Sequence, residues 1–214
     1  QSLMIYGPPG TGKSVLCQKI AESSALPVFA MARTHAASRQ LPDGITTHRW
    51  LHTHCGGRLQ ACVLIVDEFF LHECELLAQL AVFALLPGIV WVLSGDDCQL
   101  PAIDNCFGTT PIADDAVMNS DFLKQLAPVR LNLDVCKRSD AVLFAFCNRC
   151  RDMSIPFEDL LAEARAKMIC TKKPDISLVV DNVRRQAINR ECNIAAAPPD
   201  ARQCIGPDGP MHIF

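Results

Sequence analysis

The chain of 214 residues lacks the excess of positive charge that gives many nucleic-acid-binding proteins a general affinity for phosphate backbones. Lys and Arg number 20 against 23 Asp and Glu, so the formal net charge is −3 and the sequence pI is about 6.1. A nucleic-acid partner must therefore bind in a local groove. Internal repeats and low-complexity segments are absent too, and half of the residues are hydrophobic, which excludes disorder or a coiled coil and predicts a folded core.

A secretion signal is also missing, because no series of charged, apolar and small residues opens the chain. The twelve cysteines therefore indicate free thiols in a reducing, intracellular compartment such as the cytoplasm, the nucleus or a viral replication site. One Cys-x-x-Cys pair, Cys147 and Cys150, falls short of the two matched pairs that a zinc site usually shows. Neither secretion nor a zinc centre is expected.

Long apolar runs are absent except at residues 76–93, which nearly reach the roughly 20 residues that a bilayer needs. Pro87 and Gly88 form a turn signal inside this run. The turn divides the run into a helix and a short strand, so we expect no membrane insertion.

Short apolar strands alternate with longer amphipathic stretches, which predicts an α/β fold with a parallel sheet covered by helices on both faces. The strands are expected at residues 2–6, 27–31, 62–66, 89–94 and 129–133, and the helices between them at 12–24, 34–40, 72–86 and 120–126. Arg130 and Asn132 alternate with apolar residues, which places the last of these strands nearer an edge or on a half-covered face of the sheet. Further helices are expected at 140–151 and 157–168, then a strand at 176–180 and a helix through residue 193, with no predicted structure at 195–214.

The string GPPGTGKS at residues 7–14 is a complete G-x-x-x-x-G-K-S motif between a predicted strand and a predicted helix. This context predicts a P-loop that binds ATP. The nucleotide-binding candidates are Gly7, Pro8, Pro9, Gly10, Thr11, Gly12, Lys13 and Ser14. Backbone N–H groups and the helix N-terminus would face the phosphates, Lys13 would reach the β- and γ-phosphates, and the Ser14 hydroxyl would ligate Mg²⁺.

Two carboxylates, Asp67 and Glu68, follow the apolar run at residues 62–66. In a phosphate site Asp67 can hold Mg²⁺, and Glu68 can orient and deprotonate the attacking water. A strand end that simply reaches solvent is the alternative, which the complete P-loop disfavours.

The string SGDDCQLP at residues 94–101 again follows a predicted strand, where ligands of open α/β sheets collect. Together with the P-loop and the Asp-Glu pair, it resembles motif III of superfamily 1 helicases, and its Leu-Pro ending resembles the Pif-type and RecD-like branch. The resemblance implies a P-loop NTPase with a RecA-like sheet and an ATP-dependent DNA helicase that moves 5′-to-3′. It also implies that Gln99 senses the γ-phosphate and passes its state to the nucleic-acid groove.

Two weaker matches extend the resemblance along the chain. The segments ARTHAA (residues 32–37) and GITTH (44–48) resemble motif Ia and a following Thr-x-His segment, which lie along single-stranded DNA in this branch. The implied strand contacts are Thr34, Thr46, Thr47 and His48. Each could equally be an N-cap, a turn residue or part of the core. Trp50 could offer a stacking face, but a core position is favoured.

The string LNLDVCKR at residues 131–138 resembles motif IV, in which an arginine reaches the γ-phosphate from the same domain. Arg138 is that arginine, and a surface ion pair is the alternative. Residues 179–189 resemble the strand and helix that begin the second RecA-like domain. We therefore expect a RecA-like ATP-binding domain at 1–139, a helical connector at 140–172 and the truncated beginning of a second RecA-like domain at 173–214.

Several family features have no match here, including the upstream glutamine motif that reads adenine and, after residue 193, motifs V and VI. We therefore expect an excerpt or a truncated product. Two alternative functions stay open: a viral-type superfamily 1 RNA helicase, and a nucleotide-binding module without unwinding activity. Single-stranded DNA is the expected partner and RNA is possible, although no residue clearly reads a 2′-hydroxyl.

Overall fold

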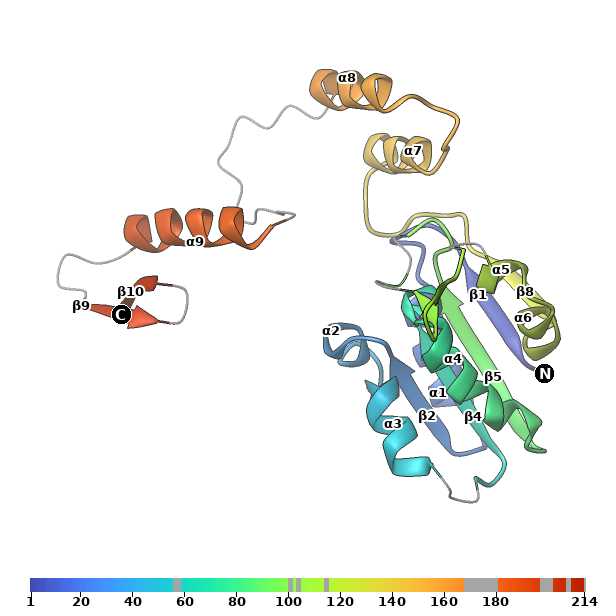
Figure 1. Ribbon diagram of the computed structural model, residues 1–214. Coiled ribbons are helices and arrows are strands. Elements are labelled where there is room, and N and C mark those ends of the chain that lie inside the picture. The colour runs from blue at the N-terminus through green and yellow to red at the C-terminus, as the bar shows by residue number, and fades with distance from the viewer. Residues whose placement is uncertain are drawn as a thin grey trace. The chain divides into compact units, whose positions relative to one another are not determined.

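The structure is a computed structural model that describes residues 1–55, 59–99, 102, 105–113, 116–167, 181–196, 202–206 and 209–213 (Figure 1). The chain divides into two compact units, Gln1–Pro156 and Phe157–Phe214. The finer division at residues 139 and 172 stays a prediction.

A six-stranded parallel sheet forms the centre of the first unit, with the strand order β3-β2-β4-β5-β1-β8. Its strands are β1 (Leu3–Tyr6), β2 (Val28–Ala32), β3 (Ile45–Thr46), β4 (Cys62–Asp67), β5 (Ile89–Gly95) and β8 (Val129–Asn132). All five strands predicted between residues 1 and 139 are present, and the edge position predicted for residues 129–133 is confirmed. The short strand β3 at the other edge was not predicted, because two residues carry no readable period.

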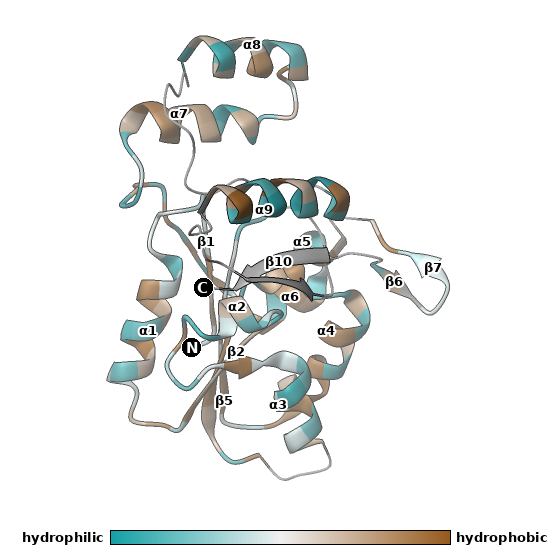
Figure 2. Cartoon of the chain, turned by 90° about the vertical axis from the view of Figure 1, so that its left-hand side faces the viewer, coloured by the Kyte–Doolittle hydropathy of each residue, from teal (hydrophilic) through white to brown (hydrophobic). Residues whose placement is uncertain are grey.

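Helices cover both faces of this sheet, as predicted, and Figure 2 shows α1 on one side of the strands and α3 and α4 on the other. The helices of the first unit are α1 (Lys13–Ser23), α2 (His35–Ser38), α3 (Thr47–His54), η1 (Phe69–Leu71), α4 (Cys74–Ala81), η2 (Val82–Leu85), α5 (Ala116–Asn119), α6 (Asp121–Leu126) and α7 (Ala141–Cys150). A short antiparallel hairpin joins β6 (Cys106–Phe107) to β7 (Thr110–Pro111). Helix α3 and this hairpin were not predicted.

Alternate residues of the central strands enter two separate cores. Leu64 and Val66 of β4 pack in the core that α3, α4 and α6 cover, whereas Val63 and Ile65 pack with α1. This arrangement explains why the central strands are apolar throughout, since both of their faces are buried. Trp50 is fully buried in the first of these cores, which confirms its predicted core position, and such burial contributes about 1.5–3 kcal/mol per large side chain.

The apolar run at residues 76–93 divides into α4, η2 and β5, with Gly88 at a φ of 80° in the turn before β5. The helix and strand predicted from Pro87 and Gly88 are therefore present. Within the described ranges, every helix is too short or too polar to cross a membrane.

The second unit contains α8 (Phe157–Lys167), α9 (Asn182–Ala196) and an antiparallel pair of strands, β9 (Arg202–Gly206) and β10 (Gly209–Ile213). The helices predicted at 157–168 and up to residue 193 are present. No structure is predicted from the sequence of residues 195–214, and β9 and β10 pair there. The strand predicted at 176–180 lies outside the described residues.

Candidate active site

The P-loop wraps closely against the chain that follows β8, and two glycines make this approach possible. Gly7 has a φ of 147°, and a Cβ there would lie 2.1 Å from the carbonyl oxygen of Leu133. Gly10 has a φ of 80°, and a Cβ there would lie 2.9 Å from the Cβ of Arg138. The backbone N–H of Lys137 donates to the carbonyl of Gly10 at 2.8 Å. The chain that follows β8 therefore places Arg138 beside the P-loop, as the sequence predicts.

Helix α1 presents an uncapped N-terminus at the end of this loop. Gly12 precedes the helix, supplies no side-chain cap, and no acidic residue lies in the first turn. The backbone N–H groups there carry the positive end of the helix dipole, which favours an anion. Thr11 bonds instead to the loop itself, because its hydroxyl donates to the carbonyl of Pro8 at 2.8 Å.

Lys13 is folded back over the loop and is 8% exposed. Its ammonium donates to the carbonyl of Gly7 at 2.7 Å and to that of Pro8 at 3.1 Å. Burial lowers the pKa of Lys13, and the nearby carboxylates of Asp96 and Glu68 oppose this shift. The Lys13 ammonium is therefore held at the P-loop by bonds to backbone carbonyls, which phosphate oxygens can replace.

Asp67, at the end of β4, joins three elements of the site and is 3% exposed. It accepts a hydrogen bond from the Ser14 hydroxyl of α1 at 2.8 Å, another from the Ser94 hydroxyl of β5, and one from the backbone N–H of Glu68 at 3.0 Å. The predicted pair of magnesium ligands, Ser14 and Asp67, is thus brought together. A carboxylate and a hydroxyl are hard oxygen ligands of the kind that Mg²⁺ prefers, so the residues fit that ion.

Glu68 adopts a left-handed backbone conformation, with φ 51° and ψ 46°, which is rare for a residue with a side chain. Among the residues that the structure describes, its buried Oε2 atom has no hydrogen-bond partner. Burial raises the pKa of Glu68, as do the charges of Asp67 and Asp96, while Lys13 lowers it. An unpaired buried carboxylate oxygen is costly for stability and can accept a proton, so it indicates a functional role.

A cavity of about 520 Å³ gathers these groups. Its walls include P-loop residues, Glu68, Gln99 and Arg138, so the structure brings all three predicted catalytic residues to one place. Gln18 and Gln40 also line it, and Gln18 donates to the Gln40 carbonyl at 2.6 Å. Neither glutamine was predicted, since no motif spacing marks them. Leu100 and Pro101, which carry part of the family resemblance, lie outside the described residues.

The predicted strand contacts Thr34 and Thr46 are helix N-caps. The Thr34 hydroxyl accepts from the N–H of Ala37 at 3.2 Å at the start of α2, and the Thr46 hydroxyl accepts from the N–H of Arg49 at 3.4 Å at the start of α3. The side chains of Thr34 and His48 are nevertheless exposed, and that of Thr46 is partly exposed. These three residues can therefore still be reached by a ligand.

Thr47 needs a correction, because it is fully buried. Its hydroxyl lies 2.7 Å from Nε2 of His72, whose Nδ1 lies 3.0 Å from the carbonyl of Phe69. A carbonyl only accepts, so Nδ1 carries the proton and Thr47 donates to Nε2. Burial lowers the pKa of His72 to about 4, which agrees with a neutral ring. Thr47 therefore holds α3 against η1 and is not a surface contact.

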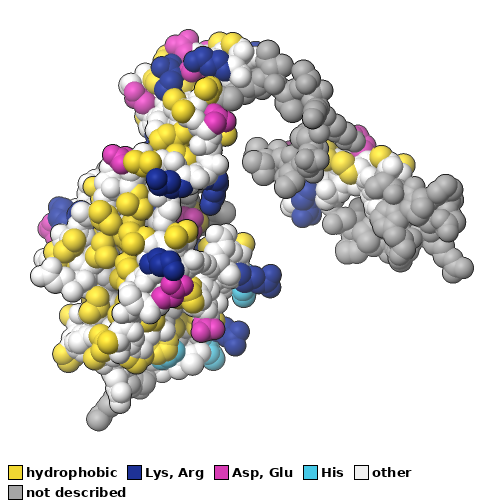
Figure 3. All heavy atoms as spheres, turned by 180° about the vertical axis from the view of Figure 1, so that it is seen from behind, with side chains coloured by type: hydrophobic (Ala, Val, Ile, Leu, Met, Phe, Trp, Pro, Cys, Tyr) yellow, Lys and Arg dark blue, Asp and Glu magenta, His cyan; other side chains and the backbone are white. Residues whose placement is uncertain are grey.

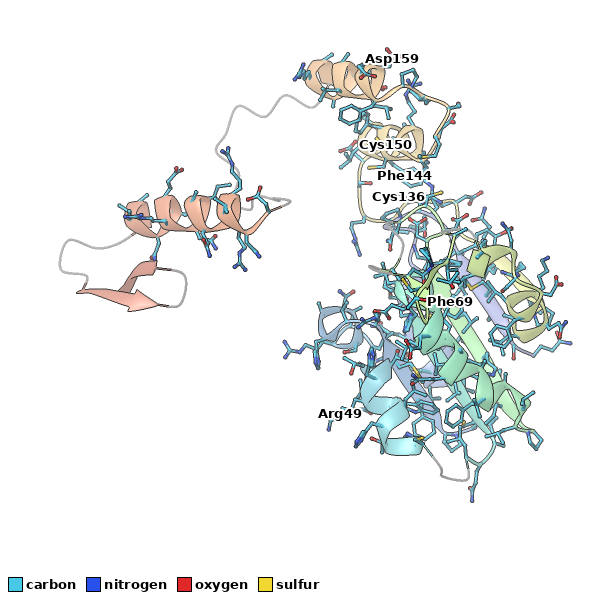
Figure 4. The ribbon with its side chains drawn as sticks, viewed as in Figure 1. Arg49, Phe69, Cys136, Phe144, Cys150 and Asp159 are labelled. Carbon is cyan, nitrogen blue, oxygen red and sulfur yellow. The ribbon has the colours of Figure 1, made fainter. Side chains whose placement is uncertain are left out.

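Exposed basic groups nevertheless gather on α2 and α3. They are His35, Arg39, His48, Arg49 and His52. Figure 3 shows basic and histidine side chains on this part of the first unit, and Figure 4 shows Arg49 on the outer side of α3. The net charge of the sequence does not reveal this local cluster, because it does not say where the basic groups lie.

The sequence profile of a family described as AAA domain matches residues 1–124. A comparison with curated proteins finds no match.

Several solved structures resemble the chain. The Pif1 helicase from Candida albicans is 22% identical, with a TM-score of 0.71, and the match covers 95% of this chain and 52% of that one. Bacteroides Pif1 bound to single-stranded DNA is 16% identical, with a TM-score of 0.64 and coverage of 95% and 55%. Bacteroides Pif1 in complex with ADP-AlF3 and single-stranded DNA is also 16% identical, with a TM-score of 0.62 and coverage of 96% and 56%.

These structural matches establish a common fold, the parallel P-loop sheet of the Pif1 helicases. The chain spans about half the length of those helicases.

Proposed function

The chain belongs to the AAA domain family, and we propose that it is the ATP-hydrolysing motor domain of a DNA helicase. The observation that carries this proposal is the convergence of Lys13, Glu68, Gln99 and Arg138 on one cavity. We propose further that hydrolysis drives 5′-to-3′ movement along single-stranded DNA and unwinding of duplex DNA, as the motif resemblance implies. The Pif1 helicases that share the fold support this assignment.

ATP would lie with its phosphates over the P-loop. The N-terminus of α1 would supply N–H donors, and Lys13 would exchange its bonds to the carbonyls of Gly7 and Pro8 for bonds to phosphate oxygens. Mg²⁺ would be held by the hydroxyl of Ser14 and the carboxylate of Asp67. When bound, the ion would neutralise charge on the phosphates. The complex of Bacteroides Pif1 with ADP-AlF3 supports a nucleotide in this fold.

Glu68 would act as the general base. Its unpaired Oε2 can accept a proton from the attacking water, and its raised pKa brings its basicity nearer to neutral pH. The strained backbone at Glu68 holds the side chain at the cavity after β4 ends. Asp67 is saturated by three donors, so it is less suited to take a proton and is better suited to orient a metal.

Gln99 and Arg138 would report on the γ-phosphate. The Arg138 guanidinium can stabilise the negative charge that spreads over the phosphoryl oxygens, as an arginine finger does. Gln99 is a neutral amide that can make and release a contact during each cycle. Both line the cavity from loops that follow strands, Gln99 after β5 and Arg138 after β8.

Single-stranded DNA would lie across α2 and α3. Thr34, Thr46 and His48 would contribute contacts, and Arg39 and Arg49 would pair with phosphates. The Bacteroides Pif1 structures with single-stranded DNA support a strand-binding role for this fold. We also propose a reducing, intracellular location, in agreement with the free thiols of the ten cysteines whose side chains the structure describes.

The proposal is tested by measuring ATP hydrolysis by this chain alone, with a single-stranded DNA oligonucleotide and with RNA of the same sequence. We expect Mg²⁺-dependent hydrolysis that DNA stimulates more strongly than RNA. Absence of hydrolysis would overturn the motor assignment, and stronger stimulation by RNA would favour an RNA helicase. A forked duplex assay that includes a longer chain then separates a helicase from a nucleotide-binding module.

A further inference from the structure

The loop that carries Gln99 to the cavity is fixed by an arginine from a helix far along the chain. Arg151, at the C-terminal end of α7, forms an ion pair with Asp96 through one guanidinium nitrogen. Its other terminal nitrogen lies 3.3 Å from a carboxylate oxygen of Asp97. One planar guanidinium thus bridges both acidic residues of the loop, which a lysine ammonium cannot do in the same geometry.

The pair with Asp96 is sequestered from solvent. The side chain of Asp96 is 2% exposed and that of Arg151 is 21% exposed. A carboxylate buried to this degree requires a charged partner, because its desolvation is otherwise uncompensated. Burial alone would lower the pKa of Arg151, but the hydrogen bond and the charge of Asp96 raise it, so the guanidinium stays charged. The contact is therefore a strong restraint on the loop, unlike an exposed surface pair.

The same aspartate organises the backbone that leads to Gln99. A carboxylate oxygen of Asp96 accepts from the N–H of Cys98 at 3.1 Å, and the carbonyl of Asp96 accepts from the N–H of Gln99 at 3.2 Å. The direction in which Gln99 leaves the loop thus depends on how Asp96 is held. Gln99 in turn lines the cavity beside Lys13 and Glu68.

We propose that Arg151 is a positioning residue that holds loop 96–99 so that Gln99 can contact the γ-phosphate. The inference rests on the proposed function, since the loop needs this precision only in a site that hydrolyses ATP. Helix α7 follows the Arg138 segment and ends at Cys150, with Arg151 as its C-cap, shortly before the first unit ends at Pro156. Displacement of α7 would therefore move loop 96–99 and with it Gln99. This makes α7 a route by which the rest of the motor can control hydrolysis.

The kinetic test uses the complete chain with Arg151→Met, Gln99→Ala and both changes together. We expect Arg151→Met to lower the DNA-stimulated kcat about tenfold, as a lost hydrogen-bonded positioning contact does, with nucleotide affinity changed less than about twofold. The double variant should be no slower than Gln99→Ala, because Arg151 acts through Gln99. Losses that multiply in the double variant would overturn the proposal. Arg151→Lys should restore part of the rate, and Lys124→Met, which removes a charge from an exposed pair with Asp121, should leave it unchanged.

Hydrogen exchange supplies a readout that does not depend on hydrolysis. The amides of Cys98 and Gln99 should exchange about tenfold faster in Arg151→Met than in the wild type, with the P-loop amides unchanged. If Arg151→Met does not fold, Asp96→Asn combined with Arg151→Met removes both buried charges and should show the same faster exchange. Equal exchange in wild type and variants would overturn the inference. A wild type that hydrolyses no ATP would instead overturn the proposed function, while the exchange result still tests the restraint.

Discussion

The nucleotide cavity and the α2–α3 surface differ in what their polar groups are already bonded to. In the cavity, Glu68 keeps an unpaired buried carboxylate oxygen, and Lys13 bonds only to loop carbonyls that a ligand could replace. On the α2–α3 surface, Thr34 and Thr46 cap helices, and Thr47 is buried against His72. A motif residue in the cavity is therefore costly to the fold and available to a ligand, whereas one on the surface largely stabilises the helix that presents it.

The largest effect should come from Glu68→Gln in the cavity. Glutamine keeps the size of the side chain but cannot accept the proton of water, so kcat for ATP hydrolysis should fall about a thousandfold with binding retained. The measurement is phosphate release together with titration of a fluorescent ATP analogue. Glu22→Gln, in an exposed pair with Lys19 on α1, serves as the matched control. A rate within a fewfold of wild type would remove Glu68 from the role of general base.

The buried histidine beneath α3 should make stability depend on pH. Burial lowers the pKa of His72 to about 4 in the folded state, against an ordinary value of 6.5 for the unfolded chain. The unfolded state therefore binds a proton between pH 6.5 and 4 that the folded state refuses, so stability is full above this window and falls as the pH drops through it. The loss should approach about 3 kcal/mol in urea unfolding. His72→Asn should lessen this dependence and His35→Asn should not, and an equal pH dependence in both variants would contradict the assignment.

Lys13→Ala should weaken ATP binding by about ten- to a hundredfold, because charge-assisted hydrogen bonds to the phosphates are lost. Isothermal titration with a non-hydrolysable analogue and Mg²⁺ measures this loss. Lys19→Ala removes a charge from the same helix, where the lysine pairs with Glu22, and should leave the affinity unchanged. Equal affinities in both variants would refute the P-loop assignment.

Thr47→Val should destabilise the fold by about 1–3 kcal/mol, since Nε2 of His72 loses its buried hydrogen-bond donor. Affinity for single-stranded DNA should not change while the protein is folded. Thr53→Val is the control on the same helix, because that exposed hydroxyl bonds only locally to the Arg49 carbonyl at 2.9 Å. Weaker DNA binding with unaltered stability would restore Thr47 as a strand contact.

The smallest effect should come from Arg49→Ala, which removes one exposed phosphate contact. Affinity for single-stranded DNA should fall a fewfold, and the slope of log K against log salt should decrease by about 0.7 to 1. Fluorescence anisotropy across a salt series measures both quantities. Lys124→Ala on α6 removes an equal charge elsewhere, so a similar loss in that variant would mean that the α2–α3 surface has no special part in binding.

The difference between the nucleotide cavity and the α2–α3 surface also explains which parts of the molecule the sequence could predict. Central strands such as β4 are unbroken apolar runs, and the P-loop and the Asp67–Glu68 pair have spacings that the chemistry of phosphate binding imposes. Helix α3 escaped prediction because Trp50 and Leu51 are the only apolar residues at positions 47–54, and two adjacent apolar residues show no helical period. The bridge from Arg151 to Asp96 joins residues 55 apart in sequence and follows no motif, so only the folded chain reveals it.

A structure of this chain with Mg²⁺ and a non-hydrolysable ATP analogue tests the central claim most directly. The account predicts the triphosphate over residues 7–14, with Lys13 moved from the carbonyls of Gly7 and Pro8 to the phosphates. It also predicts the ion at Ser14 and Asp67, and Glu68, Gln99 and Arg138 around the γ-phosphate. A nucleotide bound elsewhere, or a Lys13 that keeps its loop bonds in the complex, would contradict it.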